Sequence, residues 1–576
     1  MRHNYFIFLL FLAAALLSCA QPLSEDVRFE QLANRYIEKM IEMNPEWATE
    51  LGDHRYDHRL NDYSMENIAK NMTHDLAYLD SLKTFDPAKL NDTNKIDYAL
   101  LVDGIKAGIF DDDTVRAYEW APGRYNPGGA IYTLLINDFA PLAERLKSVK
   151  GRLQAVPGLL EQAKTNLKNP PKIQTETALI QIKGTINLVK NDLNAWLDSV
   201  PEMKAEIEPV QKEAVAALET YAEWLAKDLL PRSNGDFRIG EDMYRRKMHH
   251  RLQTDLTMED ILRMAEEEMV ATQEEIYQTA LPLYKQYFPK KSDSKSLADR
   301  KKVVKAVLDR MAEDHPDAGN IVECATACLK EAEDFVRDKE LVTLPGEPVE
   351  VVIMPEFERG FAVAYCESPG PLEKGQKTFY SISPPPSDWD ANQVTSYFRE
   401  YNNTMLYDLT VHEAMPGHYL QAAHANQFKA PTLVRVIYGS GPFSEGWATY
   451  SEQVMVAAGF GGPELKMQML KMRLRMLINA IIDRKIHTAG MTEQEAMDMM
   501  MNEGYQEQGE AAGKWRRACL SSVQLSSYYV GNIEINRIRK DYQAKMGDRF
   551  NMKEFHDKLL SYGTPPPKYV RQMMGI

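Results

Sequence analysis

The sequence has few cysteines, no excess of basic residues and no uninterrupted apolar run of 18 residues after its amino-terminal segment. Five cysteines in 576 residues are too few for the disulfide framework of a small secreted scaffold. Lys and Arg number 68 against 83 Asp and Glu, and the formal charge of -15 disfavours binding to nucleic acid phosphates. These absences leave a folded chain that is long enough for more than one domain and has no membrane span beyond its start.

The apolar run at the amino terminus has the proportions of an export signal. Arg2 precedes the run Tyr5 to Leu17, which is shorter than the ~20 residues of a membrane-spanning helix. The run ends in Ser18 and Cys19, an ending that resembles the lipobox of bacterial lipoproteins. We therefore expect residues 1–19 to be a lipoprotein signal peptide. The chain would be exported to the cell envelope and held at the membrane by a lipid on Cys19, and an ordinary secretory signal is the alternative.

Helical periodicity covers most of the chain, with one β-rich interruption. Amphipathic stretches separated by segments rich in Pro, Asp, Asn and Gly predict a helical amino-terminal region at 20–235. A second region at 236–576 is also helical, except for a small sheet expected at about 341–383. The β-rich runs are Val349–Ile353, Phe361–Tyr365 and Thr378–Ile382. The predicted fold class is mainly α, a multi-helix protein with a small sheet before the segment described next.

Two helix starts can be predicted from capping residues. Thr257 precedes an acidic turn and a pattern that continues as one long helix from Met258 to Tyr284. Thr492 is followed three residues later by Glu495, which is the spacing of a capping box.

One segment after the β-rich runs carries residues suited to metal chemistry. In the common motif His-Glu-x-x-His, two histidines four apart share one helix face and bind Zn²⁺, while the glutamate holds the attacking water. Here Glu413 follows His412, but His418 is six residues away, roughly 240° around a straight helix. Pro416 and Gly417 favour a break that could bring the imidazoles together. The alternative is a kinked helix end with surface histidines.

A later glutamate could complete the site. Glu445 lies far enough beyond His418 for the chain to return on a second helix. Two His and one Glu leave a fourth position for water, which is the arrangement of a catalytic zinc site. Glu452 is seven residues further, on nearly the same helix face, and could orient one imidazole. Either glutamate could instead be a solvated surface residue.

Several ordered motifs run along the chain. They are His-Glu-Ala-Met-Pro-Gly-His at 412–418, Glu-Gly-Trp-Ala-Thr-Tyr at 445–450, Asp-Arg-Lys-Ile-His at 483–487, Gln524 with Tyr528 and Gly531, and the segments 52–57 and 550–556. Together these motifs resemble the bacterial family known as domain of unknown function 885. The resemblance covers nearly the whole chain after the export signal, with one departure at Ser522 and Val523, where the family often has Pro-Gly. It implies a mostly helical, zincin-like metallopeptidase fold with zinc held by two His and one Glu.

The hypothesis that follows is an exported zinc-dependent peptidase. Zinc on His412, His418 and Glu445 would acidify its water, and Glu413 would take the proton and deliver it to the departing amine. Short peptides are the expected substrates, because the long helical first half could wall off a narrow channel. The alternatives are a hydrolase of another amide and a lipid-anchored binding protein whose metal site has decayed.

The residues around the reacting bond are less closely defined. His487 and Tyr528 are the candidate donors to the oxyanion. Asp483 could fix the tautomer of His487 or form an ordinary helix pair with it. An extended peptide could pair with a strand near Ala362 to Tyr365. A terminal carboxylate could meet one of several arginines, none of them favoured by the sequence: Arg473, Arg475, Arg516 or Arg539.

Overall fold

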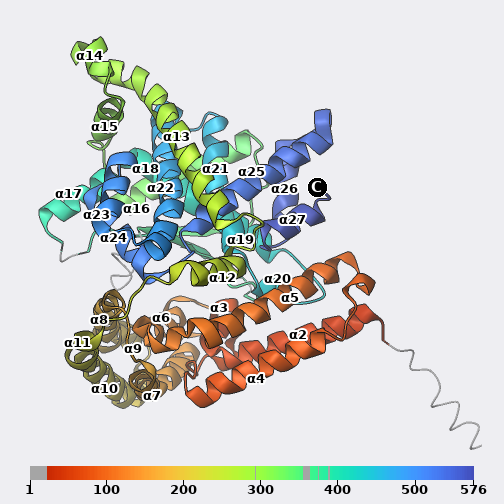
Figure 1. Cartoon of the computed structure of the whole chain (residues 1–576). Coiled ribbons are helices and arrows are strands. Elements are labelled where there is room, and N and C mark those ends of the chain that lie inside the picture. Colours follow the sequence, from red (N-terminus) through yellow and green to blue (C-terminus); the bar gives the residue numbers. More distant parts are fainter. Residues whose placement is uncertain (1–22, 292, 355–362, 374, 387–388) are drawn as a thin grey trace, which may run out of the picture.

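Helices dominate the computed structural model, which describes residues 23–576 except 292, 355–362, 374 and 387–388. The predicted signal peptide and its Cys19 lie outside these described residues. Within them, the prediction of a mainly α protein with a small sheet is confirmed (Figure 1). No helix in this part of the chain combines the length and the apolar character needed to cross a membrane.

The first half of the chain forms two helical groups in the lower part of Figure 1. One group packs around Phe29 and Leu101, and the other around Leu153 and Leu218, all four fully buried. The first group contains α2 (Glu25–Met43), α3 (Pro45–Leu51), α4 (Met65–Leu82) and α5 (Asp92–Phe110), and the second contains α6 (Gly128–Ile136), α7 (Leu142–Asn166), α8 (Lys172–Asn187), α9 (Leu193–Ser199), α10 (Pro201–Trp224) and α11 (Leu230–Arg232).

A short helix of the second half, α20 (Val434–Ile437), joins the two halves. Val434 and Ile437 belong to the same apolar core as α2 and α5. Between them, Arg435 Nε lies 2.6 Å from Asp97 Oδ1, and both side chains are almost completely buried. Because an unpaired buried charge is costly, this ion pair fixes how α20 and α5 lie together.

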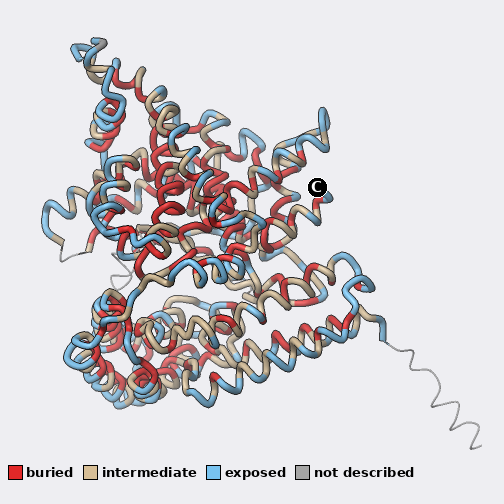
Figure 2. The backbone as a smooth tube through the Cα atoms, in the orientation of Figure 1, coloured by how far each residue is buried: buried red, intermediate tan, exposed pale blue. Residues whose placement is uncertain are grey.

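The second half packs its helices around α22 (Gly462–Ala489), which is buried on nearly all sides. Figure 2 shows the buried residues gathered in the middle of this half, with exposed residues towards its outer ends. The remaining helices are α12 (Gly240–Leu252), α13 (Met258–Tyr287), α14 (Ser294–Leu297), α15 (Arg300–Met311), α16 (Ile321–Asp338), α17 (Ala391–Glu400), α18 (Asn403–Glu413), α19 (His418–Asn426), α21 (Gly441–Ala457), α23 (Glu493–Asp498), α24 (Gln508–Leu520), α25 (Ser526–Met546), α26 (Met552–Leu560) and α27 (Pro567–Met573).

Both predicted helix starts are confirmed. Thr257 accepts a hydrogen bond from Asp260 N, and the Asp260 side chain accepts one from Thr257 N in return. The helix that follows, α13, is continuous as predicted and ends three residues later than expected, at Tyr287. Thr492 and Glu495 form the second capping box, at the start of α23.

The small sheet contains β1 (Val349–Ile353), β2 (Ala364–Glu367) and β3 (Thr378–Ile382) in the order β1-β3-β2. β1 runs parallel to β3, and β2 runs antiparallel to it, in register from Ala364 opposite Ile382. The first and third predicted runs are confirmed, whereas the second strand begins later than predicted and extends to Glu367. Residues 361 and 362 of the predicted run lie outside the described part.

Two glycines allow α21 and α25 to cross at close range. A Cβ atom on Gly446 would lie 2.3 Å from the Gly531 carbonyl carbon, and one on Gly531 would lie 1.9 Å from the Pro442 oxygen. No side chain larger than hydrogen fits at either position without moving the backbone. The crossing therefore fixes the positions of Glu445, next to Gly446, and Tyr528, one turn before Gly531.

Candidate metal centre

The helix break predicted between the two histidines is present. α18 ends at Glu413 and α19 begins at His418, with a cis peptide bond between Met415 and Pro416. The turn folds back so tightly that a Cβ atom on Gly417 would lie 1.8 Å from the His412 carbonyl oxygen. Glycine is therefore required here by space.

A tryptophan of α21 holds this turn in place. Trp447 is buried, and its Nε1 donates a hydrogen bond of 2.7 Å to the Pro416 carbonyl oxygen. Because Trp447 lies two residues after Glu445, the same contact that fixes the turn also brings the glutamate to the two histidines.

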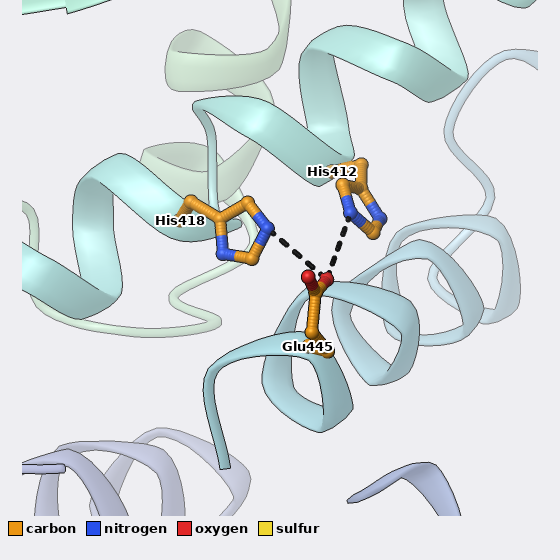
Figure 3. Close-up of side chains that lie close together, drawn as sticks. All are labelled: His412, His418 and Glu445. Carbon is orange, nitrogen blue, oxygen red and sulfur yellow. Dashed lines mark ion pairs between the residues drawn. The ribbon is translucent and has the colours of Figure 1, made fainter. Parts of the chain in front are cut away.

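His412, His418 and Glu445 converge from α18, α19 and α21 (Figure 3). Glu445 Oε2 lies 3.6 Å from His412 Nε2 and 3.4 Å from His418 Nε2. Each residue offers one possible ligand atom, and these three atoms all lie within 4.8 Å of one another. The ligands of a tetrahedral zinc with bonds of ~2.0–2.1 Å lie about 3.3 Å apart. The three side chains are thus close enough together to hold one metal ion.

Glu445 Oε2, the oxygen that faces the two histidines, is buried and has no hydrogen-bond partner among the described residues. Burial would raise the pKa of Glu445, but His412 and His418 outweigh it, so the pKa lies below its ordinary value. The described contacts of Oε2 are the two imidazole nitrogens at 3.4 and 3.6 Å, and a cation between the three atoms would satisfy all of them at shorter distances.

Glu452 holds the other side of the first histidine. Its Oε1 lies 2.6 Å from His412 Nδ1, which leaves Nε2 directed towards Glu445. Burial would lower the pKa of His412, but Glu445 and Glu452 outweigh it, and the pKa lies well above its ordinary value. Asp408 lies beside this pair, and burial together with the charge of Glu452 raises its pKa. A carboxylate on the far nitrogen is a common support for a metal-binding imidazole.

Glu413 is partly buried at the end of α18, and no described residue forms a hydrogen bond with its carboxylate. Burial raises the pKa of Glu413, against the opposing charges of His412 and His418. A carboxylate with a raised pKa is a better proton acceptor near neutral pH than an ordinary surface glutamate.

Tyr528 lies next to the three candidate ligands His412, His418 and Glu445, called the metal cluster below, and its hydroxyl contacts an arginine. Its ring centroid is 6.4 Å from that of His412, and its hydroxyl accepts a hydrogen bond of 3.0 Å from Arg517 Nη2. Burial and the charge of Glu445 raise the pKa of Tyr528, so the hydroxyl stays protonated. Arg517 Nη2 also donates to Gln524 Oε1 at 3.0 Å. Arg517 was missed by the sequence reasoning, because it belongs to no motif.

His487 lies away from the metal cluster and contacts backbone carbonyls. Its Nε2 is 2.9 Å from the Ala518 carbonyl oxygen and 2.8 Å from that of Ser521, at the end of α24. Its ring contacts are with Phe237 and Tyr244. Within the described chain, none of its contacts is with a residue of the metal cluster, so the structure does not bring it together with Tyr528.

Asp483 supports the turn between α24 and α25. It accepts hydrogen bonds from Val523 N at 3.0 Å and from Ser526 N at 3.1 Å, and no hydrogen bond joins it to His487 in the described chain. Val523 has a positive φ of 69°, a conformation that glycine adopts most easily. The departure from the family pattern therefore falls on a left-handed residue of this turn.

The arginines considered for a terminal carboxylate are mostly engaged elsewhere. Arg473 pairs with Glu268, and Arg475 pairs with Glu400. Arg516 is exposed on α24, and Arg539 lies over the ring of Tyr450.

Comparisons with known proteins give the family and the fold. A model of the family described as "Bacterial protein of unknown function (DUF885)" matches residues 45–574. A candidate lipoprotein of unknown function from Shewanella oneidensis has a solved structure with a TM-score of 0.79 and 33% identity, covering 95% of this chain and 100% of that one. A candidate lipoprotein from Colwellia psychrerythraea shares the fold, with a TM-score of 0.78, 18% identity, and coverage of 96% and 99%. No curated protein matches.

Proposed function

We propose that this chain, which belongs to the bacterial family of unknown function DUF885, is an exported, lipid-anchored, zinc-dependent hydrolase of peptide bonds in short peptides. The observation that carries the proposal is the convergence of His412, His418 and Glu445 around a buried carboxylate oxygen that has no described hydrogen-bond partner. Two nitrogens and one oxygen form a donor set that suits zinc and leaves a position open for water.

Bound zinc would lower the pKa of a coordinated water towards neutrality. Glu413 is adjacent in sequence to His412, its pKa is raised by burial, and its carboxylate is not used in any described hydrogen bond. We assign to it the acceptance of the proton from the attacking water and the return of that proton to the departing amine.

Tyr528 supplies the donor for the developing oxyanion. Its hydroxyl remains protonated because burial and Glu445 raise its pKa, and Arg517 orients the hydroxyl by donating to its oxygen. A preorganised donor of this kind, in a site shielded from water, stabilises charge that appears only in the transition state. His487 is not assigned this role, because its Nε2 faces two backbone carbonyls.

The sheet offers a place for an extended peptide. β2 is an edge strand, and it packs against both α18 and α19, the helices that carry the two histidines. A peptide added along β2 would form backbone hydrogen bonds and lie beside the metal ligands.

A lipid anchor on Cys19 would place this activity at the surface of a membrane. The support is the Ser18-Cys19 ending of the apolar run and the likeness to two candidate lipoproteins. We expect Cys19→Ala to abolish incorporation of labelled fatty acid and to move the protein from the membrane fraction to the soluble fraction. Labelling that persists in this variant would contradict the anchor.

Glu413→Gln tests the proposed chemistry. A mixed-sequence peptide library is incubated with zinc-loaded wild type, with wild type after chelation, and with zinc-loaded Glu413→Gln. We expect cleavage only by zinc-loaded wild type, and a rate about 10²–10⁴-fold lower for the variant, which is the usual contribution of a general base. The matched control is Glu493→Gln, an exposed carboxylate on α23, which should cleave like wild type. Cleavage by Glu413→Gln at the wild-type rate would refute the role of this residue.

A further inference from the structure

Helix α24 carries a guanidinium beside the metal cluster that has no carboxylate partner in the described chain. Arg517 is only partly exposed, and its hydrogen bonds are those from Nη2 to Gln524 and Tyr528. Its Nε and Nη1 groups donate to no described residue. Arginine has five N–H donors in a planar fork that matches a carboxylate, so most of its binding capacity is unused.

Three more deeply buried cations of the second half have carboxylate partners. Arg475 lies 2.7 Å from Glu400, Lys471 lies 2.9 Å from the same carboxylate, and Arg435 pairs with Asp97. This contrast matters because removing a charge from water without a partner is costly. Arg517 has no such ion pair among the described residues, and it lies in the place where a substrate would have to bind.

Arg517 is close enough to the cluster to act on the same molecule. Its Nη2 is 3.0 Å from the hydroxyl of Tyr528, whose ring stacks towards His412. Its charge also contributes to the pKa values of Glu413 and Tyr528. One residue of an extended peptide spans ~3.5 Å, so a group held by Arg517 belongs to the part of the substrate next to the cleaved bond.

A second cation lies behind the first. Lys514 is three residues before Arg517 on α24, a spacing that places both side chains on neighbouring positions of one helix face. Lys514 is 9% exposed, and its Nζ lies 3.8 Å from Glu510 Oε1, longer than a hydrogen bond. Lys514 and Glu510 thus lie as an ion pair behind Arg517, and the guanidinium is the charge on this face of α24 that has no described carboxylate within ion-pair distance.

We propose that Arg517, with Lys514 behind it, binds the free carboxylate at the carboxyl terminus of a peptide substrate. The protein would then cleave peptides near their carboxyl ends and would need a substrate short enough, or free enough at that end, to reach α24. The cleavage step rests on the proposed function, whereas the binding of the carboxylate does not.

The test uses one mixed-sequence pentapeptide library prepared in two forms, with a free carboxyl terminus and with a carboxyl-terminal amide. Zinc-loaded wild type should cleave the free acids with a kcat/KM about 100-fold higher than the amides, as expected for loss of a charge-assisted bidentate contact. Arg517→Met should slow both forms through the loss of its contact with Tyr528, and should slow the free acids by about a further 100-fold, so that the preference disappears. Arg517→Lys, which keeps the charge and loses the fork, should retain part of it.

Two controls separate this role from others. Arg516→Met removes the exposed neighbouring arginine and should keep the full preference. Tyr528→Phe should slow the acids and the amides equally. If Arg517 acted only by orienting Tyr528, then Arg517→Met would do the same, and this result would overturn the proposal.

A binding measurement keeps the test independent of hydrolysis. In equilibrium dialysis with the Glu413→Gln protein, the free acids should be retained about 10-fold or more over the amides, and Arg517→Met should abolish the difference. Equal retention of both forms by the parent protein overturns the carboxylate site. Absence of cleavage together with selective retention of the acids leaves the carboxylate site standing and refutes the peptidase function instead.

Discussion

Replacing Glu452 by glutamine should weaken metal binding without removing any metal ligand. The carboxylate lies 2.6 Å from His412 Nδ1, and only 4% of Glu452 is exposed, so water cannot replace it as the acceptor. Glutamine keeps the shape but loses the charge that makes His412 a stronger donor to a cation. It also presents an NH₂ group that can face Nδ1 and turn the ring.

The expected loss is a 10- to 100-fold weaker zinc affinity, or about 1.4–2.7 kcal/mol, which is the usual cost of removing such a support. Proton release should change as well. Because Glu445 and Glu452 raise the pKa of His412, metal-free wild type carries a proton on this ring that zinc must displace. Glu452→Gln removes one of these carboxylates, so zinc binding by the variant should release fewer protons.

Isothermal titration in two buffers of different ionisation enthalpy measures both quantities. The matched control is Glu464→Gln on α22, whose carboxylate accepts a hydrogen bond of 3.0 Å from Tyr287 and has no described contact with the metal cluster. It should bind zinc like wild type. A zinc affinity of Glu452→Gln within about twofold of wild type, or an equal loss in both variants, would show that the carboxylate does not support His412.

Two further predictions concern the turn and the stability of the chain. Gly417→Ala should abolish zinc binding and lower the free energy of unfolding by about 3 kcal/mol or more, because its Cβ would collide with the His412 oxygen. The control is Gly513→Ala, whose Cβ meets open space on α24. It should be neutral or stabilising by up to about 1 kcal/mol when the unfolding of both variants is measured by urea titration. Burial lowers the pKa of His556 to about 4, from an ordinary value of 6.5. Between these two pH values the unfolded chain binds a proton that the folded chain does not, so metal-free protein should lose about 2–4 kcal/mol as the pH falls through this window. The slope should be smaller in His556→Gln, and equal slopes would contradict the assignment.

The parts of the fold that were predicted correctly are those with local causes. The capping residues Thr257 and Thr492 start helices through contacts within one turn, and β1 and β3 are bounded by Pro and Gly. The second strand was placed too early, because its register is chosen by pairing with β3 and not by the Gly360 that precedes the run in the sequence. The residues of the second strand alone therefore do not determine its register.

The convergence of the three candidate ligands could be predicted in part, because the spacing of the two histidines is unusual for a straight helix. Pro416 and Gly417 indicated a break, and the structure places His412, His418 and Glu445 together as the spacing suggested. The sequence could not predict which ring nitrogen of His412 would contact Glu445 and which would contact Glu452. That choice depends on how α21 crosses α25 at Gly446 and Gly531.

The surroundings of the cluster depend on contacts between distant segments. His487 follows Asp483 by one helical turn, yet its partners are carbonyls at the end of α24 and those of Asp483 are at the start of α25. Arg517 belongs to no motif, and its place beside Tyr528 results from the packing of α24 against α22. Long-range packing of this kind has no signal in the spacing of residues along one segment.

The most direct test of the metal centre is its zinc content, measured by mass spectrometry after zinc supplementation and removal of free metal. We expect about one zinc per chain in wild type and in Glu413→Gln, and nearly none in His412→Ala, His418→Ala or Glu445→Ala. Circular dichroism of the three ligand variants would verify that each remains folded. Wild type without zinc, or ligand variants that keep zinc at the wild-type level, would contradict a metal site built by His412, His418 and Glu445.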